Sequence, residues 1–311
     1  MTKTALLFAG QGAQVIGMGK DLAETSGSAR AWFDRANAVL DYDLASICFR
    51  GPEAELTKTE NAQPGIFLVS WVAFQALRER WPALAFEATA GLSLGEFTAL
   101  AAAGALSFED GLKTVRRRGQ LMQQACEVTG GSMAAIIGLD EAPTREICAQ
   151  TGVVLANLNC PGQLVISGES AKIQQACELA NARGARRALP LAVAGAYHSP
   201  LMQSAQPGLR AELGGFALRP PIVPVISNVT AQPHTDAGAI RDRLVEQVTA
   251  SVRWEESMRY LLAQGFSRFI ELGPGTALSG FMRRIDKNAV MLNVADGPSL
   301  EATIQTLGVN P

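Results

Sequence analysis

The chain has 311 residues, enough for two ordinary domains or for one large α/β core. Hydrophobic residues make up 48% and charged residues 18%, which excludes an intrinsically disordered, collagen-like or coiled-coil protein. The 27 basic and 29 acidic side chains nearly cancel, so the overall charge indicates neither a nucleic-acid partner nor an anionic membrane.

The first part of the chain predicts alternating strands and helices. Residues 4–9 are apolar and predict a short buried strand, which ends in the turn Gly10-Gln11-Gly12. The elements expected next are helices at about 20–40 and 61–81, a strand within 84–92, a helix at 93–103 and an amphipathic helix at about 108–126. This order is typical of an α/β protein.

From about residue 130 the pattern changes to short strands paired with two helices. The expected elements are strand 132–138, helix 141–150, strands 153–158 and 163–167, helix 171–183 and strand 185–191. The order β-α-β-β-α-β is that of a ferredoxin-like unit. We therefore expect an inserted subdomain at 129–195 within a core formed by 1–128 and 196–311.

The α/β alternation resumes after this segment. The expected elements are a helix from 200, a strand at 222–227, helices at about 237–249 and 254–264, a strand at 268–272, a helix at 276–285, a strand at 289–294 and a helix from 299. The longest uncharged stretches, 61–77 and 188–209, contain polar residues and fall short of the roughly 20 apolar residues of a membrane span. We expect no transmembrane helix.

The cysteines and the N-terminal residues indicate where the protein acts. The five cysteines are scattered, without C-x-x-C spacing, and are Cys48, Cys126, Cys148, Cys160 and Cys177. They predict reduced, mostly buried thiols and no metal site. The apolar start is too short for a secretory signal, so we expect a cytoplasmic protein.

The segment Gly91-Leu92-Ser93-Leu94-Gly95 is a G-x-S-x-G motif at a predicted junction of strand and helix. Such a motif forms a nucleophile elbow, in which a tight turn exposes the serine hydroxyl near a helix N-terminus. The flanking glycines allow the strand and the helix to approach closely. With 30 glycines in the chain the match also arises by chance, but its context favours a nucleophile at Ser93.

A serine nucleophile needs a base, and the chain contains two histidines. His234 lies in a polar loop and is best explained as a solvated surface residue. His198 stands at the entry to a helix after the inserted segment. A lone histidine is more often structural, but together with the elbow His198 is the expected general base.

The turn Gly10-Gln11-Gly12 has two interpretations. It is either a plain glycine turn or part of an oxyanion hole. In the second case the backbone N–H groups of Gln11 and Leu94, the residue after the serine, hold the negative oxygen of a tetrahedral intermediate.

These residues resemble the malonyl-CoA:acyl carrier protein transacylases of fatty-acid synthesis and the related acyltransferase domains of polyketide synthases. The resemblance runs from the first strand to the last helix. Besides the glycine turn and the elbow, it rests on Gln63-Pro64, Arg118-Gly119, Met133-Ala134-Ala135, Ala196-Tyr197-His198-Ser199, Leu201-Met202, Val252-Arg253-Trp254 and Glu271-Leu272-Gly273-Pro274-Gly275.

The resemblance implies an α/β-hydrolase-like core with a ferredoxin-like insertion, in agreement with the pattern of elements. It also implies a ping-pong transfer of malonyl from malonyl-CoA through a malonyl-serine to the phosphopantetheine thiol of acyl carrier protein. In this reaction Ser93 is the nucleophile, His198 the general base and acid, and Gln11 and Leu94 the oxyanion donors. Gln247 matches the residue whose backbone carbonyl orients the histidine.

The resemblance further assigns the malonyl carboxylate to Arg118. By spacing alone, Arg116, Arg117 and Arg118 are best explained as the solvated face of a helix. Only one of three successive helical residues can point into a cleft, and the match to the family's Arg-Gly pair selects Arg118. A guanidinium meets a carboxylate with two parallel charge-assisted hydrogen bonds, which lysine cannot do.

Three further positions bear on the choice of acyl group. Tyr197 is expected to narrow the space near the acyl α-carbon and to favour malonyl over methylmalonyl, and Met133 is expected to contact the substrate. Family members usually have histidine before the nucleophilic serine, whereas this chain has Leu92. That difference affects acyl preference and rate rather than the catalytic pair.

The expected partners are malonyl-CoA and an acidic acyl carrier protein, with no cofactor, no nucleic acid and no membrane, and the protein is expected to be a monomer. An acidic carrier needs a basic rim, and each candidate is also explained as an ordinary solvated charge. The candidates are Arg116, Arg117, Arg183, Arg186, Arg187, Arg283, Arg284 and Lys287.

Several alternatives stay open at this stage. A stand-alone acyltransferase of a polyketide synthase or of a malonate decarboxylase system would carry the same residues. A serine esterase or thioesterase would use the same elbow, but it would expect an acidic third member of the triad and has no need of Arg118. A binding protein without catalysis is disfavoured by the presence of Ser93, His198 and Arg118.

Overall fold

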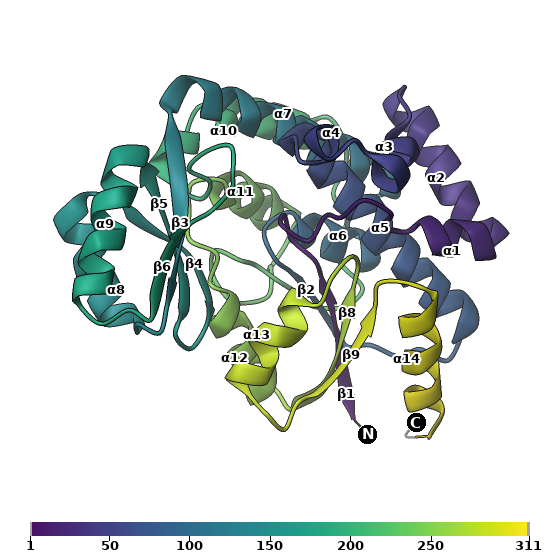
Figure 1. Cartoon of the computed structure of the whole chain (residues 1–311). Coiled ribbons are helices and arrows are strands. Elements are labelled where there is room, and N and C mark those ends of the chain that lie inside the picture. The colour runs from purple at the N-terminus through teal and green to yellow at the C-terminus, as the bar shows by residue number, and fades with distance from the viewer. Residues whose placement is uncertain (1, 310–311) are drawn as a thin grey trace.

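The computed structural model describes residues 2–309 and shows an α/β protein with two separate sheets (Figure 1). The larger sheet is parallel, with the strand order β7-β2-β1-β8-β9. Its strands are β1 (Lys3–Phe8), β2 (Ala88–Gly91), β7 (Val225–Ile226), β8 (Phe266–Leu272) and β9 (Val290–Val294). The strands at residues 4–9 and 268–272 that the sequence predicts are therefore present.

Helices cover both faces of this sheet, because successive side chains of a strand point to opposite sides. Leu6 and Phe8 of β1 belong to the large hydrophobic core, whereas Ala5 and Leu7 belong to a second core with Trp254. The helices before the insertion are α1 (Lys20–Thr25), α2 (Gly27–Leu40), α3 (Leu44–Arg50), α4 (Glu53–Leu56), α5 (Thr59–Arg80), α6 (Gly95–Ala102) and α7 (Phe108–Thr129). Those after it are the 3-10 turn η1 (Pro200–Met202), α10 (Ala205–Gly214), α11 (Ala237–Gln247), α12 (Trp254–Ala263), α13 (Ala277–Ile285) and α14 (Gly297–Val309).

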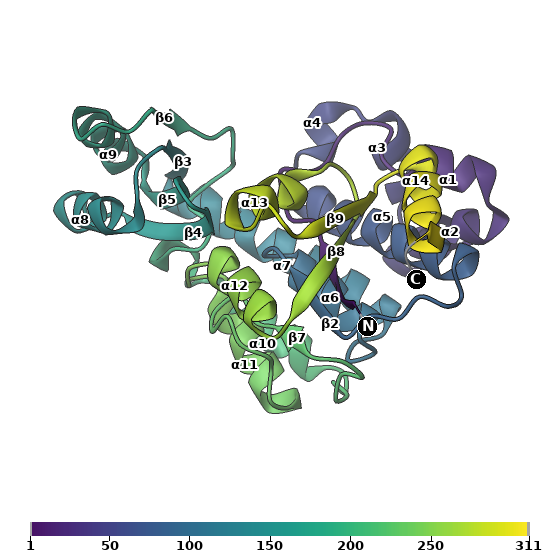
Figure 2. The ribbon, with the colours of Figure 1, turned by 90° about the horizontal axis from the view of Figure 1, so that it is seen from below.

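The smaller sheet is antiparallel and lies at one end of the molecule, with α8 and α9 beside it (Figure 2). Its order is β4-β5-β3-β6. The elements are β3 (Gly131–Ile137), α8 (Glu141–Thr151), β4 (Val154–Cys160), β5 (Gln163–Glu169), α9 (Ser170–Ala182) and β6 (Arg187–Pro190). They enclose a hydrophobic core of their own, which includes Ile136, Ile147 and Ile166.

The smaller sheet is hydrogen-bonded to the rest of the chain at two places. Val252 donates to the carbonyl of Ala156 over 2.8 Å and accepts from the N–H of Leu158 over 2.9 Å, which adds one parallel bridge to β4. In addition, Arg284 of α13 donates to the carbonyl of Pro161 in the β4–β5 turn over 2.6 Å. These contacts tie the smaller sheet to the segments that follow it in the chain.

Several boundaries differ from the sequence-based expectation. The single helix expected at 20–40 is two helices, because Ser26 adopts an extended conformation and its side chain caps α2 by accepting from Ala29 N–H. The strands expected at 84–92 and 222–227 shorten to β2 and β7. Sequence analysis missed α3 and α4. Asp43 caps α3 by accepting from the N–H of Ser46.

Among the described residues no helix is both long and apolar enough to cross a membrane. All five cysteines are buried with free thiols, as the sequence predicts. Burial raises the pKa of Cys126, Cys148 and Cys160 to about 11, so these thiols stay protonated near neutral pH.

Candidate active site

Ser93 occupies a sharp turn between β2 and α6. Its φ of 53° lies in the left-handed region that non-glycine residues rarely adopt. A Cβ on Gly91 would lie 2.0 Å from the backbone of Gly95, and one on Gly95 would lie 2.3 Å from the carbonyl oxygen of Phe8. Only glycine fits either position, so the G-x-S-x-G motif forms the elbow that the sequence predicts.

The structure brings His198 to Ser93 from 105 residues away in the chain. Its Nε2 lies 2.8 Å from Ser93 Oγ, and its Nδ1 lies 2.8 Å from the backbone carbonyl oxygen of Gln247. Because a carbonyl only accepts, the proton belongs on Nδ1, and Nε2 then accepts from the serine hydroxyl. This tautomer is the one that a general base requires.

The environment of His198 keeps its imidazole neutral. The side chain is buried, and the positive Arg118 lies close to it. Burial, followed by the charge of Arg118, lowers the pKa of His198 from 6.5 to about 4. His198 is therefore ready to accept a proton throughout the neutral range.

This shift predicts an unusual pH profile for the reaction at Ser93. We expect kcat/KM for loading of the serine to stay constant from pH 8 to about 5 and to fall only as the pH approaches 4. The stability of the fold depends on the same group. Between pH 6.5 and 4, His198 binds a proton in the unfolded chain but not in the folded protein, so the free energy of unfolding falls by roughly 1 kcal/mol per pH unit from 6.5 toward 4. Initial rates and urea unfolding across this range test both statements. A rate profile with its midpoint near pH 6.5 would contradict the first statement, and a free energy of unfolding that stays constant from pH 6.5 to 4 would contradict the second.

Arg118 of α7 is buried, with 1% of its surface exposed, and it lies beside Ser93. Its Nη2 donates to Ser93 Oγ over 3.0 Å and to Gln247 Oε1 over 2.9 Å, and its Nη1 donates to Gln63 Oε1 over 2.8 Å. Nε is buried without a hydrogen-bond partner. Burial lowers the pKa of Arg118 to about 10, so the guanidinium is a charged group held in the protein interior.

The two neighbouring arginines do not enter the site. Arg116 is half-buried and donates to the carbonyl of Leu40, with its guanidinium over the ring of Tyr42. Arg117 is half-buried and contacts Gln120 on its own helix. Of the three successive arginines, only Arg118 is buried beside Ser93, in agreement with the helical argument made from the sequence.

The Gly10-Gln11-Gly12 turn lies against the elbow. A Cβ on Gly10 would come within 2.6 Å of the carbonyl oxygen of Leu92, the residue before Ser93. Within residues 2–309, the backbone N–H groups of Gln11 and Leu94 have no hydrogen-bond acceptor in the protein. The side chain of Gln11 accepts from Gln63 Nε2 over 3.4 Å, which links this turn to the residue that holds Arg118.

Tyr197, Met133 and Leu92 lie in different surroundings. Tyr197 is buried, and its hydroxyl lies 2.6 Å from Thr59 Oγ1 at the start of α5. Met133 of β3 is also buried and packs in the large core of the molecule. Leu92 is partly buried and packs against the core that contains Trp254.

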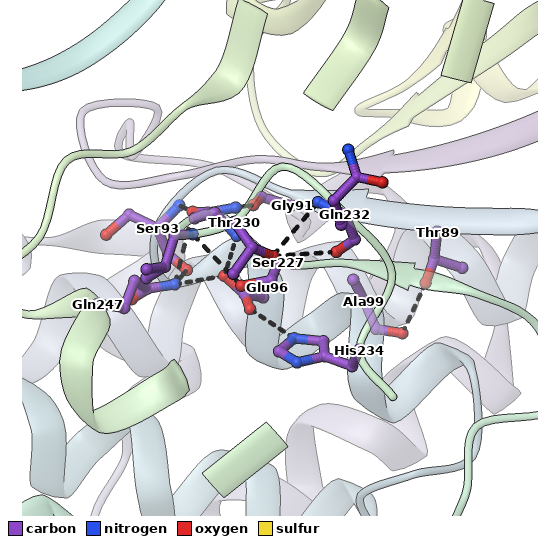
Figure 3. Close-up of polar contacts among 12 residues, drawn as sticks. Thr89, Gly91, Ser93, Glu96, Ala99, Ser227, Thr230, Gln232, His234 and Gln247 are labelled. Carbon is purple, nitrogen blue, oxygen red and sulfur yellow. Dashed lines mark hydrogen bonds and ion pairs between the residues drawn. The ribbon is translucent and has the colours of Figure 1, made fainter. Parts of the chain in front are cut away.

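The interpretation of His234 as a solvated surface residue is wrong. The backbone of this loop is partly exposed, but the imidazole itself is only 1% exposed. Its Nε2 lies 2.8 Å from Glu96 Oε1. Figure 3 shows the imidazole turned toward this carboxylate. The local sequence of the loop gives no sign of this contact, because the carboxylate that His234 faces is 138 residues away in the chain.

Two residues behind Ser93 were not expected from the sequence. Asn228 accepts from the backbone N–H of Ser93 over 2.6 Å and donates to the carbonyl of Gly91 over 2.7 Å, which holds both sides of the strained turn. Glu96 is fully buried and accepts from the side-chain amide of Gln247 over 2.7 Å. A signal for Glu96 existed, because it is the only charged residue from 91 to 107.

Within the described chain no group of three His, Cys, Asp or Glu side chains is placed to hold a metal ion. The chemistry visible at the site is instead a hydroxyl 2.8 Å from a neutral imidazole, with a buried cation 3.0 Å away. A serine and histidine so arranged on an elbow of a parallel sheet are the arrangement of serine-dependent acyl-transfer enzymes, a class that includes both hydrolases and transferases.

The comparisons with known proteins narrow this class. The acyl transferase domain family matches residues 5–296. Malonyl CoA-acyl carrier protein transacylase of Bacillus subtilis (strain 168) is 44% identical over 312 residues, which cover 99% of this chain and 98% of the relative. The chain therefore belongs to the acyl transferase family, and the resemblance found in its sequence is confirmed.

Solved structures agree with this assignment. The acyl-carrier-protein-S-malonyltransferase from Bartonella henselae has a TM-score of 0.94 and 40% identity, covering 98% of this chain and 99% of that one. A malonyl-transacylase in complex with a type II PKS acyl-carrier protein has a TM-score of 0.94 and 37% identity, covering 98% of this chain and 100% of that one.

Proposed function

We propose that this protein transfers the malonyl group from malonyl-CoA to the phosphopantetheine thiol of an acyl carrier protein and so supplies fatty-acid synthesis. The single observation that supports this reaction best is the buried guanidinium of Arg118, 3.0 Å from Ser93 Oγ. A buried cation at the nucleophile suits an acyl group with a free carboxylate and is of no use to a neutral ester. The names of the relatives point to the same substrate and the same carrier.

The proposed reaction has two matching halves. Ser93 Oγ attacks the thioester carbonyl while His198 Nε2 takes the hydroxyl proton, and the N–H groups of Gln11 and Leu94 stabilise the oxyanion. The C–S bond then breaks, and His198 returns the proton to the departing CoA thiolate. The carrier thiol attacks the malonyl-serine ester, again losing its proton to His198, which finally reprotonates Ser93.

In this proposal Gln247 replaces the acid of a serine protease triad. Its backbone carbonyl accepts from His198 Nδ1 and holds the ring toward Ser93. A neutral carbonyl suffices because thiolates leave more easily than amines, so less basicity is asked of the imidazole. The absence of an acid at this hydrogen bond argues against the serine esterase alternative.

The malonyl carboxylate is proposed to take over the hydrogen bond that Arg118 Nη2 gives to Ser93 Oγ. Nε, which is buried without an acceptor, supplies the second N–H of a two-point contact. Tyr197 and Met133 are proposed to limit the space around the acyl chain, and both are buried. The proposed chemistry uses no metal and no cofactor.

The finer description of the fold is also a proposal. We describe the parallel sheet with its serine elbow as α/β-hydrolase-like, and the β-α-β-β-α-β unit, with its order β4-β5-β3-β6, as ferredoxin-like. The proposed core is 1–128 and 196–311, and the proposed subdomain is 129–195. The separate hydrophobic core around Ile136 and Ile166 supports this division. Residues 1, 310 and 311 of the proposed core lie outside the described residues.

The carrier protein is proposed to meet exposed basic residues of both parts. Four of the eight candidates are hydrogen-bonded within the chain: Arg116 to Leu40, Arg117 to Gln120, Arg183 to Glu146 and Arg284 to Pro161. The exposed remainder is Arg186, Arg187, Arg283 and Lys287. We further propose that the protein acts as a monomer in the cytoplasm.

A second context is a polyketide pathway. One structural neighbour is a malonyl-transacylase in complex with a type II PKS acyl-carrier protein. The residues around Ser93 suit either pathway, because both carriers present the same phosphopantetheine thiol. The same residues would also suit the acyltransferase of a malonate decarboxylase system.

Intact-mass measurement after mixing with malonyl-CoA tests the proposal directly. We expect a malonyl adduct that disappears in Ser93→Ala and that is discharged to the thiol of a phosphopantetheinylated carrier protein. Acetyl-CoA in a parallel reaction is expected to give a slower adduct, because it offers no carboxylate to Arg118. Rapid loss of the malonyl adduct to water with no transfer to the carrier would favour the esterase.

A further inference from the structure

A buried carboxylate lies directly behind the proposed catalytic groups and has no part in the proposed reaction. Glu96 is 0% exposed on α6, whose other residues are apolar or small. Its Oε2 accepts from Gln247 Nε2 over 2.7 Å and from the backbone N–H of Asn228 over 3.0 Å, and its Oε1 faces His234 Nε2 over 2.8 Å. Figure 3 shows Glu96 between Gln247 and His234.

Glu96 determines which end of the Gln247 amide faces the active site. A carboxylate only accepts, so the NH₂ group must point to Glu96, where it also donates to the carbonyl of Ser93 over 3.0 Å. The amide oxygen is thereby turned to Arg118 Nη2, 2.9 Å away. The opposite orientation would place the NH₂ group against the guanidinium, and the amide oxygen against two acceptors, the carboxylate of Glu96 and the carbonyl oxygen of Ser93.

Two opposite buried charges are thus joined by one neutral amide. Arg118 and Glu96 do not touch each other, but each is hydrogen-bonded to the side chain of Gln247. The negative charge of Glu96 raises the pKa of Arg118 and so partly offsets the effect of burial. A buried charge is costly unless it is hydrogen-bonded and balanced, and this arrangement satisfies both conditions.

His234 completes the set of donors around Glu96. The Oε1 atom is an acceptor only, so the proton of the imidazole belongs on Nε2. His234 Nδ1 is buried without a partner, which is tolerable for a lone pair and costly for a charged N–H group. The Nε2–H group of His234 therefore serves as a fixed donor to one oxygen of Glu96, while the other oxygen accepts from Gln247.

We propose that Glu96 and His234 form a positioning pair that turns the Gln247 side-chain amide toward Arg118 and thereby sets the preference of the site for malonyl over uncharged acyl groups. The inference rests on the proposed function, because it needs Arg118 to hold the malonyl carboxylate. The backbone carbonyl of Gln247 serves His198, and the side chain of the same residue serves Arg118. Glu96 and His234 are positioning residues, since neither touches the reacting atoms.

The test compares kcat/KM for malonyl-CoA and acetyl-CoA in the same preparation of each variant. His234→Leu removes the N–H donor, and we expect the ratio of malonyl to acetyl kcat/KM to fall about three- to tenfold with the acetyl value within twofold of wild type. His234→Gln keeps an N–H at a similar reach and is expected to restore most of the ratio. Thr235→Ala, an exposed neighbour in the same loop, is the matched control and is expected to leave both values unchanged.

The ratio separates positioning from simple stability, because a partly unfolded preparation loses both activities equally. If His234→Leu is too unstable to assay, Glu96→Gln, which keeps the side-chain volume, is measured in the same way and is expected to lower the same ratio. Equal loss of both activities, or an unchanged ratio in folded His234→Leu or Glu96→Gln, would overturn the inference. Failure of the proposed function is distinguishable, since the wild-type protein would then form no malonyl adduct at all.

Discussion

Replacing His198 by asparagine is expected to slow formation of the malonyl-Ser93 adduct by about 100- to 10,000-fold near neutral pH. The imidazole is 2.8 Å from Ser93 Oγ and is the base in the proposed reaction. Asparagine is the better choice than alanine here because His198 has a φ of 57°, and asparagine tolerates the left-handed region more easily than most residues. Quenched-flow intact-mass measurement gives the rate.

Two controls make that result interpretable. Urea unfolding of His198→Asn shows whether the fold survives, and Ser93→Ala defines the background of adducts formed elsewhere on the chain. A folded His198→Asn protein that loads malonyl at the wild-type rate would remove His198 from the mechanism.

Replacing Arg118 by methionine is expected to lower kcat/KM for malonyl-CoA by about 100- to 1,000-fold and to leave the acetyl-CoA value within about threefold. The guanidinium is the buried cation at Ser93, and only malonyl carries a carboxylate for it. Removing this charge also removes one cause of the low pKa of His198, so the acidic limb of the acetyl profile is expected to move to higher pH.

Arg117→Met supplies the matched control for this change. Arg117 precedes Arg118 on α7, but it is half-buried and donates to Gln120 of its own helix. We expect both activities of Arg117→Met to match wild type. If Arg118→Met lost malonyl and acetyl transfer to the same extent, Arg118 would be a structural residue rather than the carboxylate site.

Much of the fold followed from local patterns in the sequence. The strand-turn pattern around Gly10 and the G-x-S-x-G motif predicted the ends of two strands, and the structure pairs these strands side by side in parallel. Boundaries were less predictable. Ser26 interrupts a continuous helical pattern because its side chain accepts a hydrogen bond from a free N–H group at the start of α2. The spacing of the hydrophobic residues does not reveal this stabilising contact.

The site shows the same division between local and distant information. Ser93 was identifiable because its elbow depends on glycines two residues away on either side. His234 was misread because its burial depends on Glu96, which approaches it only after α6 and the loop following β7 are folded. A polar loop sequence predicts side chains exposed to solvent. Nothing in the neighbouring residues indicates that a buried hydrogen-bond acceptor lies on another element.

The amino-acid sequence by itself indicated the family, most of the order of the elements and the tight turn at Ser93, since each follows from spacing within one segment or from resemblance along the chain. The sequence suggested that His198 serves Ser93, but only the tertiary structure gave the geometry of that pair and brought Glu96 to both Gln247 and His234. Hydrogen bonds act over about 3 Å. Sequence separation does not encode such distances, so the buried network became visible only in the folded chain.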